Sequence, residues 1–232
     1  MKNDSEQLDL LLVGHAVEDW IFEDDKEPYQ KWGGIYNCGR SFNKVATGYW
    51  GYPPPKINIE PCAYGHAFVK INRQNATKDV EVSLNDRSRK PTIVNSKWTH
   101  YCYLNQLENF DIIAQKVGII SADLCKGWAN RFHYKYFNYI FLSSDEHDPE
   151  SQSKGVEDVI FISHSPEKVE IWESGKKLWQ SEPIEQIKEG MILGIGDHFA
   201  SSFIVDKLYN HTEDKDAVNF AIARCRDYLL YS

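Results

Sequence analysis

The sequence lacks the features that mark nucleic-acid binders and membrane-spanning proteins. Of its 232 residues, 26 are Lys or Arg and 34 are Asp or Glu, which gives a formal net charge of −8. A general nucleic-acid binder needs a basic face, so this balance argues against that class, whereas a small anionic ligand needs only a local positive site. No apolar run is as long as a membrane span, so a membrane protein is not expected either.

The cysteines and histidines show no metal-binding or disulfide pattern. The five cysteines are scattered without a C-x-x-C pair, and the eight histidines show no metal spacing on one helix face. Residues 1–8 are polar and acidic, unlike the start of a secretory signal peptide. We therefore expect reduced thiols in a cytoplasmic protein, with neither a zinc site nor a disulfide framework.

The order of the apolar segments predicts an α/β fold. Residues 8–13 form an apolar run broken only by Asp9, as in a buried parallel strand, and we expect Gly14 to end it. Further strands are predicted at 98–103, 117–122, 139–142 and 159–163, and helices at 35–46, 106–115, 199–209 and 214–231. Strands that alternate with helices imply a mainly parallel sheet with helices on both faces.

Residues 57–94 follow a different pattern. Apolar and polar residues alternate there, which is typical of a sheet with one face in water. A short hairpin is also predicted at 169–179, with its turn at Ser174-Gly175. Because no internal repeat or low-complexity linker divides the chain, we expect one domain with a small strand insertion.

The segment Gly194-Ile195-Gly196-Asp197 is the strongest candidate for chemistry. Two glycines allow a tight backbone turn, and the apolar spacing that follows predicts a helix. A helix N-terminus has unpaired N–H groups and a partial positive charge, so it suits an anion such as a phosphate. A carboxylate placed there can take a proton from a substrate hydroxyl. The alternative is that Asp197 only caps the helix and that the glycines only form a turn.

Two earlier segments are weaker candidates. Asp19 follows the first predicted strand, and ligands in open α/β sheets lie beyond the carboxyl ends of strands. A solvated loop carboxylate explains it equally well. Gly33-Gly34 opens the predicted helix 35–46, and a paired glycine there allows a ligand to approach the backbone closely.

Taken in chain order, these motifs resemble those of the ribokinase-like (PfkB) family of carbohydrate and nucleoside kinases. Gly194 to Asp197 is similar to the family's G-x-G-D signature, and Gly14 to Asp19 to its first-strand motif. Gly33-Gly34 resembles the di-glycine that contacts substrate, and Ser143 to Glu146 resembles the N-x-x-E motif with Ser in place of Asn. The resemblance covers nearly the whole chain.

The resemblance implies a fold. It is a three-layer αβα sandwich with a mainly parallel central sheet and a small β-sheet lid. Residues 1–232 would form a single domain, with the lid strands lying roughly within 17–33 and 64–95. The resemblance also implies that two copies can pair through the lid.

The resemblance further implies the site and its cofactors, ATP and Mg²⁺. Asp197 would be the base, with Gly194, Ile195 and Gly196 around the transferring phosphoryl group. The sugar or nucleoside would be held by Asp19, Gly33, Gly34 and Asn37, the nucleotide by Ser163 and Ser165, and Mg²⁺ indirectly by Glu146. Cys38 stands where the family has an Asn, which is displaced to Asn37.

The function expected from this resemblance is transfer of the ATP γ-phosphate to a sugar or nucleoside hydroxyl. The turn 164–168 has no glycine where the nucleotide approaches, so we predict weak Mg-ATP binding. A non-catalytic relative that binds a sugar or nucleoside as a sensor or partner subunit is an alternative, as is an unrelated α/β enzyme that shares G-x-G-D by chance. The intact Asp197 favours the kinase, because a pure binder has no need of a base.

Overall fold

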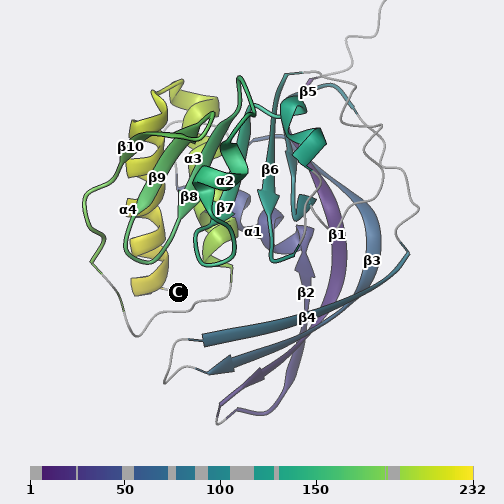
Figure 1. Ribbon diagram of the computed structural model, residues 1–232. Coiled ribbons are helices and arrows are strands. Elements are labelled where there is room, and N and C mark those ends of the chain that lie inside the picture. The colour runs from purple at the N-terminus through teal and green to yellow at the C-terminus, as the bar shows by residue number, and fades with distance from the viewer. Residues whose placement is uncertain are drawn as a thin grey trace, which may run out of the picture.

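A single ten-stranded sheet runs through the whole molecule (Figure 1). The computed structural model describes residues 7–24, 26–48, 55–72, 77–86, 94–104, 118–127, 131–185, 187 and 194–231. The strand order is β10-β9-β8-β7-β6-β5-β1-β3-β4, and β2 pairs with β1. The strands are β1 (Leu8–Glu23), β2 (Tyr29–Gly34), β3 (Ile57–Asn72), β4 (Thr77–Asp86), β5 (Ser96–Tyr101), β6 (Ile119–Leu124), β7 (Tyr139–Ser143), β8 (Ile160–His164), β9 (Val169–Glu173) and β10 (Lys176–Gln180).

The centre of the sheet is parallel. Strands β3, β1, β5, β6, β7 and β8 all pair in parallel, whereas β2, β4, β9 and β10 pair antiparallel with their neighbours. The antiparallel hairpin β9–β10 turns at Ser174 and Gly175, both of which have positive φ, as a tight hairpin turn requires. The predicted mainly parallel sheet and its hairpin are therefore confirmed.

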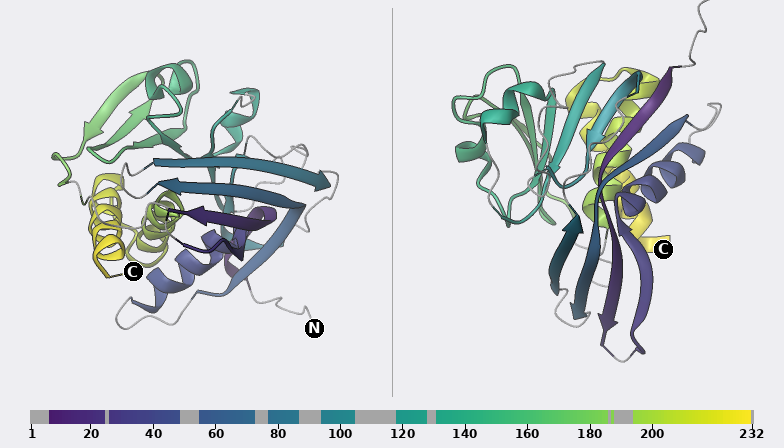
Figure 2. Two further views of the ribbon diagram at one scale, coloured as in Figure 1. Left: turned by 90° about the horizontal axis from the view of Figure 1, so that it is seen from below. Right: turned by 90° about the vertical axis from the view of Figure 1, so that its right-hand side faces the viewer.

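Helices cover both faces of the central sheet (Figure 2). Helices α1 (Ile35–Thr47), α3 (Ile195–Asn210) and α4 (Asp214–Tyr231) bury residues such as Phe42, Phe203 and Val218 in one apolar cluster. On the other face, Tyr134 lies in a 3-10 helix (Arg131–Tyr136) and Phe137 directly follows it. Both side chains pack against the strands near α2 (Pro149–Ser153). This arrangement confirms the predicted three-layer sandwich. The helix predicted at 106–115 lies outside the described residues.

The prediction that the first strand ends at Gly14 is wrong. Strand β1 continues to Glu23, with only a shift in its pairing with β3 between Gly14 and His15. A Cβ on Gly14 would lie 3.0 Å from the Cβ of Cys102, so this glycine allows a close crossing and does not terminate the strand. The first half of β1 pairs with β5 and its second half with β2, so one strand belongs to two parts of the sheet.

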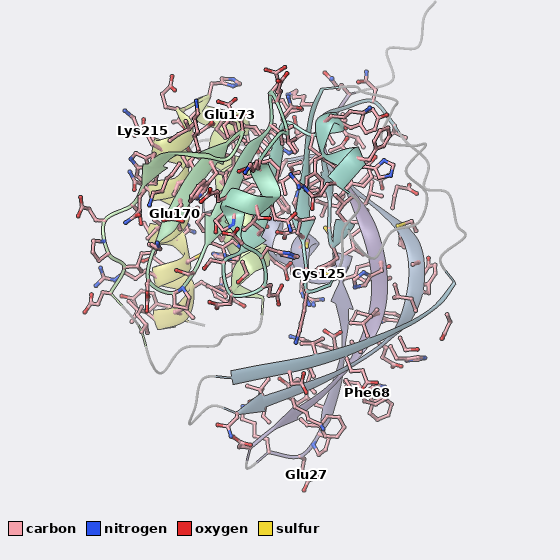
Figure 3. All side chains as sticks on the ribbon, viewed as in Figure 1. Glu27, Phe68, Cys125, Glu170, Glu173 and Lys215 are labelled. Carbon is pink, nitrogen blue, oxygen red and sulfur yellow. The ribbon has the colours of Figure 1, made fainter. Side chains whose placement is uncertain are left out.

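The second half of β1 forms a curved extension of this sheet with β2, β3 and β4, which projects from one end of the molecule (Figure 1). We call these four paired segments the lid. Its inner face has a small core of buried side chains, namely Val17, Ile21, Ala67, Val69 and Ile71. Its other face exposes Trp20, Phe22 and Phe68, the last of which is labelled in Figure 3. Among the described helices, none is long and apolar enough to cross a membrane.

Candidate active site

The carboxylate of Asp197 lies buried in the first turn of α3. Gly194, whose φ is 81°, is the N-cap of this helix in the left-handed conformation that favours glycine, so Asp197 is the third helical residue and not the cap. Only 7% of Asp197 is exposed. Its Oδ1 atom accepts a hydrogen bond of 2.8 Å from the Tyr103 hydroxyl and one of 3.1 Å from the Cys38 thiol. The structure thus rules out the simple capping role.

These contacts come from separate elements of the fold. Cys38 lies on the buried face of α1, and Tyr103 lies in the turn that follows β5. Asp123, near the carboxyl end of β6, lies within electrostatic reach of Asp197. Burial, and then the negative charges of Asp197 and Glu146, raise the pKa of Asp123 well above its usual range.

A second carboxylate, Asp19, lies on the lid half of β1. A Cβ on Gly33 would lie only 1.9 Å from Asp19 Oδ2, so the Asp19 side chain occupies the space that any other residue at position 33 would fill. Burial raises the pKa of Asp19 to about 6, against the lowering effects of Lys31 and of a hydrogen bond with Asn37. The charge of Asp197 also raises this pKa, which places the two carboxylates within electrostatic reach of each other.

The di-glycine connects these groups. Gly33 and Gly34 end β2, and α1 begins directly after them at Ile35. Asn37 is therefore in the first turn of α1, where its amide oxygen also accepts a hydrogen bond from Arg40. Asp19, Gly33, Gly34 and Asn37 are thus adjacent, as their predicted common role requires. Their role in holding a sugar or nucleoside stays a prediction.

The end of β8 approaches the start of α3. A Cβ on Gly196 would lie 3.6 Å from the His164 ring, and this ring is 5.4 Å from that of Phe199. One residue earlier, Ser163 is 2% exposed, and its hydroxyl has no hydrogen-bond partner among the described residues. A buried hydroxyl without a partner is costly unless a ligand or water satisfies it.

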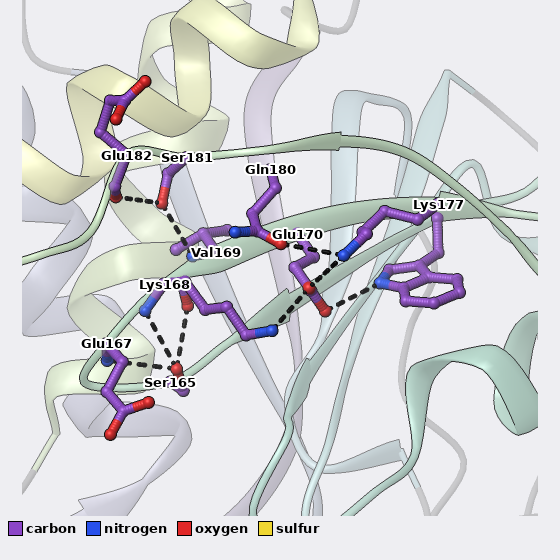
Figure 4. Close-up of polar contacts among 10 residues, drawn as sticks. Ser165, Glu167, Lys168, Val169, Glu170, Lys177, Gln180, Ser181 and Glu182 are labelled. Atoms are coloured by element: carbon purple, nitrogen blue, oxygen red, sulfur yellow. Dashed lines mark hydrogen bonds and ion pairs between the residues drawn. The ribbon is translucent and has the colours of Figure 1, made fainter.

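The turn between β8 and β9 is closed by its own hydrogen bonds (Figure 4). The Ser165 hydroxyl accepts from the amides of Glu167 and Lys168, and the Ser165 amide donates to the Lys168 carbonyl at 2.9 Å. These amides are therefore already used within the turn. Ser165 thus serves the turn itself, which leaves its predicted contact with nucleotide as a prediction only.

Two lysines stabilise the strand that follows this turn. Lys168 and Lys177 approach the same Glu170 oxygen at 2.8 and 3.0 Å (Figure 4). Burial alone would raise the pKa of Glu170, but hydrogen bonds from the two lysines lower it. This network holds the turn in place from its carboxyl side.

The structure also allows a test of the expected magnesium site. Among the described residues, no group of three or more His, Cys, Asp or Glu side chains is arranged to hold a metal ion. Mg²⁺, however, is usually held by one or two carboxylates together with substrate phosphates and waters. Glu146 is exposed and close enough to Asp123 for its charge to act on it, so the side chains present fit that mode of binding.

Sequence reasoning missed several residues of this region. Asp123 could have been recognised from the sequence, because a carboxylate at the end of a predicted parallel strand lies at the ligand-binding edge of the sheet. Tyr103 carried no signal, since its approach to Asp197 spans 94 positions of sequence. Lys31 lies directly opposite Asp19 across the β1–β2 pair, and that register was not predictable either.

The sequence matches no family model and no curated protein. Solved structures, in contrast, match over almost the whole chain. A ribokinase from Thermotoga maritima is 15% identical, with 94% of this chain and 91% of that one covered and a TM-score of 0.68. The fold is ribokinase-like.

Other structures with the ribokinase-like fold match equally well. An adenosine kinase from Anopheles gambiae is 12% identical, with 95% of both chains covered and a TM-score of 0.67. A pyrophosphate-dependent kinase in the ribokinase family is 14% identical, with 95% of both chains covered and a TM-score of 0.66. The predicted ribokinase-like architecture is therefore confirmed, while identities this low carry no information about substrate.

Proposed function

We propose that this protein is a kinase that transfers the γ-phosphate of ATP to a hydroxyl group of a sugar or nucleoside. The observation that carries the proposal is the buried Asp197 carboxylate at the amino end of α3, within electrostatic reach of Asp19. Phosphoryl transfer depends mainly on positioning and electrostatics, and this region combines a base, helix amides and polar substrate-binding groups.

In the proposed reaction, Asp197 takes the proton of the acceptor hydroxyl. The acceptor oxygen forms a bond to the γ-phosphorus while the bond from that phosphorus to the bridging oxygen of ADP breaks, and ADP leaves. The amides of residues 195–197 are in the first turn of α3, at the partially positive end of the helix. They stabilise the negative charge on the transferring group.

Asp19 and Asn37 hold the acceptor hydroxyls in this proposal, with Gly33 and Gly34 allowing the acceptor to lie against the backbone. Asp19 is well suited because Asn37 already fixes its carboxylate from one side. The acceptor hydroxyl then lies between the lid and Asp197. The contacts that Asp19 makes orient the acceptor hydroxyl, and this orientation supplies the larger part of the rate enhancement in such reactions.

ATP with Mg²⁺ is the proposed phosphate donor. Mg²⁺ would neutralise charge on the donor phosphates, with Glu146 holding it through water. Ser163 contributes a buried hydroxyl that has no partner among the described residues, and a donor phosphate is suited to accept its hydrogen bond. Ser165 is occupied within its own turn, so donor affinity is expected to be low.

The closed turn at residues 164–168 also favours the second candidate, a non-catalytic protein that binds a sugar or nucleoside. Such a protein would keep Asp19 and Asn37 and would not need amides available for a nucleotide. For either candidate, the five free cysteines suit a reducing compartment such as the cytoplasm. The exposed Trp20 and Phe68 on the lid suit pairing with a second copy.

A screen of phosphate-donor consumption over a panel of sugars and nucleosides tests the proposal. Each acceptor is tested with Mg-ATP and, in parallel, with magnesium pyrophosphate, because a closed turn affects a nucleotide more than a small donor. The Asp197→Asn variant serves as the matched control. Turnover by the wild type that the variant lacks supports the kinase, and binding of an acceptor without turnover by any donor supports the non-catalytic protein.

A further inference from the structure

Among the described residues, Tyr103 and Cys38 donate hydrogen bonds to the Asp197 carboxylate that the proposed reaction does not by itself require. Tyr103 approaches from the turn after β5 and Cys38 from α1, and both donate to the same oxygen, Oδ1. Three segments of the chain, far apart in sequence, therefore meet at one carboxylate oxygen. The other oxygen, Oδ2, faces Gly194, being 3.8 Å from where a Cβ at that position would lie.

Both donors keep their protons under ordinary conditions. Burial, and then the charge of Asp197, raise the pKa of Tyr103 well above its usual range. A hydrogen bond with Cys102, and then burial, raise the pKa of Cys38 in the same direction. A neutral phenol and a neutral thiol facing a carboxylate can only donate to it.

Tyr103 is held in a conformation that costs energy. Its φ is 60°, which is a rare value for a bulky side chain. The Tyr103 ring lies 4.7 Å from the ring of His15. Burial lowers the pKa of His15 to about 4, so the Tyr103 ring packs against a neutral imidazole. Backbone strain of this kind persists where the surrounding structure demands it, and it is concentrated at functional sites.

We propose that Tyr103 and Cys38 are positioning residues that hold Asp197 by its Oδ1 atom and keep its carboxylate ionised. This inference rests on the proposed function, in which Asp197 is the base. Hydrogen bonds to the charged form of an acid favour that form, and two donors on one oxygen also fix the rotation of the carboxylate.

The electrostatic setting of Asp197 gives such donors a role. Other titratable groups whose charges act on Asp197, or on which its charge acts, are Asp19, Lys31, Cys102, Asp123 and Tyr228. The charge of Asp19 and the burial of Asp197 oppose ionisation of Asp197, whereas the charge of Lys31 favours it. The two neutral donors oppose the effects of Asp19 and of burial without adding a cation that would compete for the transferring phosphate.

The test compares Tyr103→Phe with Tyr139→Phe. Tyr139 makes a matched bond, donating to Asp214 at 3.0 Å at the start of α4. We expect Tyr103→Phe to move the acid limb of the kcat profile, measured at saturating acceptor, up by about one pH unit, a roughly tenfold loss on that limb. The plateau at higher pH should change by less than about threefold, and Tyr139→Phe should leave the profile unchanged.

Cys38 supplies a second pair of variants if Tyr103→Phe fails to fold. Cys38→Ser keeps a donor and should retain the wild-type profile, whereas Cys38→Ala should shift it in the same direction as Tyr103→Phe. A purely structural role would lower kcat equally at every pH. That result, or an equal shift for Cys38→Ser and Cys38→Ala, would overturn the inference.

A measurement without turnover separates this inference from the proposed function. The ¹³C signal of the Asp197 carboxyl, assigned by its loss in Asp197→Asn, is followed against pH in wild type and variants. Its titration midpoint should rise in Tyr103→Phe and Cys38→Ala only. An unchanged midpoint contradicts the inference even in an active kinase, and a raised midpoint supports it even if no acceptor is phosphorylated.

Discussion

Replacing Asp197 with Asn changes one charge at the centre of the candidate site and leaves its packing intact. The Asn side chain has the same size, and its Oδ1 atom can still accept the bonds from Tyr103 and Cys38. Gly194 remains the N-cap, so α3 should form as before. We therefore expect a folded variant whose thermal stability is close to that of the wild type.

The expected loss of activity follows from the loss of the proposed base alone. General-base catalysis is typically worth about 10²–10⁴-fold in rate, which corresponds to roughly 2.7–5.5 kcal/mol of activation free energy. Turnover should fall by at least about a hundredfold, while the dissociation constants of acceptor and donor change by only a few-fold.

The structure adds an internal check on this variant. The charge of Asp197 helps to raise the pKa of both Asp19 and Asp123. Its removal should move the pKa of Asp19 down from about 6, which is measurable as a shift in the pH dependence of acceptor binding. This shift shows that the variant is folded and that the two carboxylates interact.

The assay measures ADP release at saturating donor together with acceptor binding by calorimetry. Turnover of Asp197→Asn within about tenfold of wild type would refute the assignment of the base. Equal weakening of both ligands would instead indicate a folding defect, and a thermal-unfolding measurement distinguishes the two.

Further predictions concern Asp19, the turn and the lid. Acceptor affinity should fall as the pH drops through about 6, because protonated Asp19 is a poorer acceptor; Asp19→Asn should bind with little pH dependence, and a pH-independent wild type would contradict this. Asp19→Ala should weaken acceptor binding by roughly 1–3 kcal/mol and leave ATP affinity unchanged in the same calorimetric titrations; equal losses for both ligands would show a different site. Mg-ATP should give only a small thermal shift, and a dissociation constant of about 1 μM or tighter would show that the closed turn at 164–168 does not limit nucleotide binding. Phe68→Asp, on the exposed face of the lid, should convert a dimer to a monomer in light-scattering measurements, and a wild-type monomer at high concentration would exclude pairing through that face.

The sequence by itself determined the layers of the fold and the elements that carry the candidate site. The apolar run at residues 8–13, the alternation of strands and helices and the hairpin turn at Ser174-Gly175 each reflect local physics, namely side-chain period and permitted backbone angles. The same local physics predicted a helix at 199–209, which in the structure already begins at Ile195, and another helix directly after Gly34. These motifs could therefore be recognised without the structure, although the solved structures named above are only 12–15% identical.

The tertiary structure decided how these elements meet. It showed that β1 runs through Gly14 into the lid, because pairing with β2 and β3 outweighs the weak strand preference of one glycine. It also brought Tyr103 and Cys38 to one oxygen of Asp197, and Asp19 against Gly33. Contacts of this kind depend on strand register and on helix packing over long sequence separations, and no local pattern of residues records them.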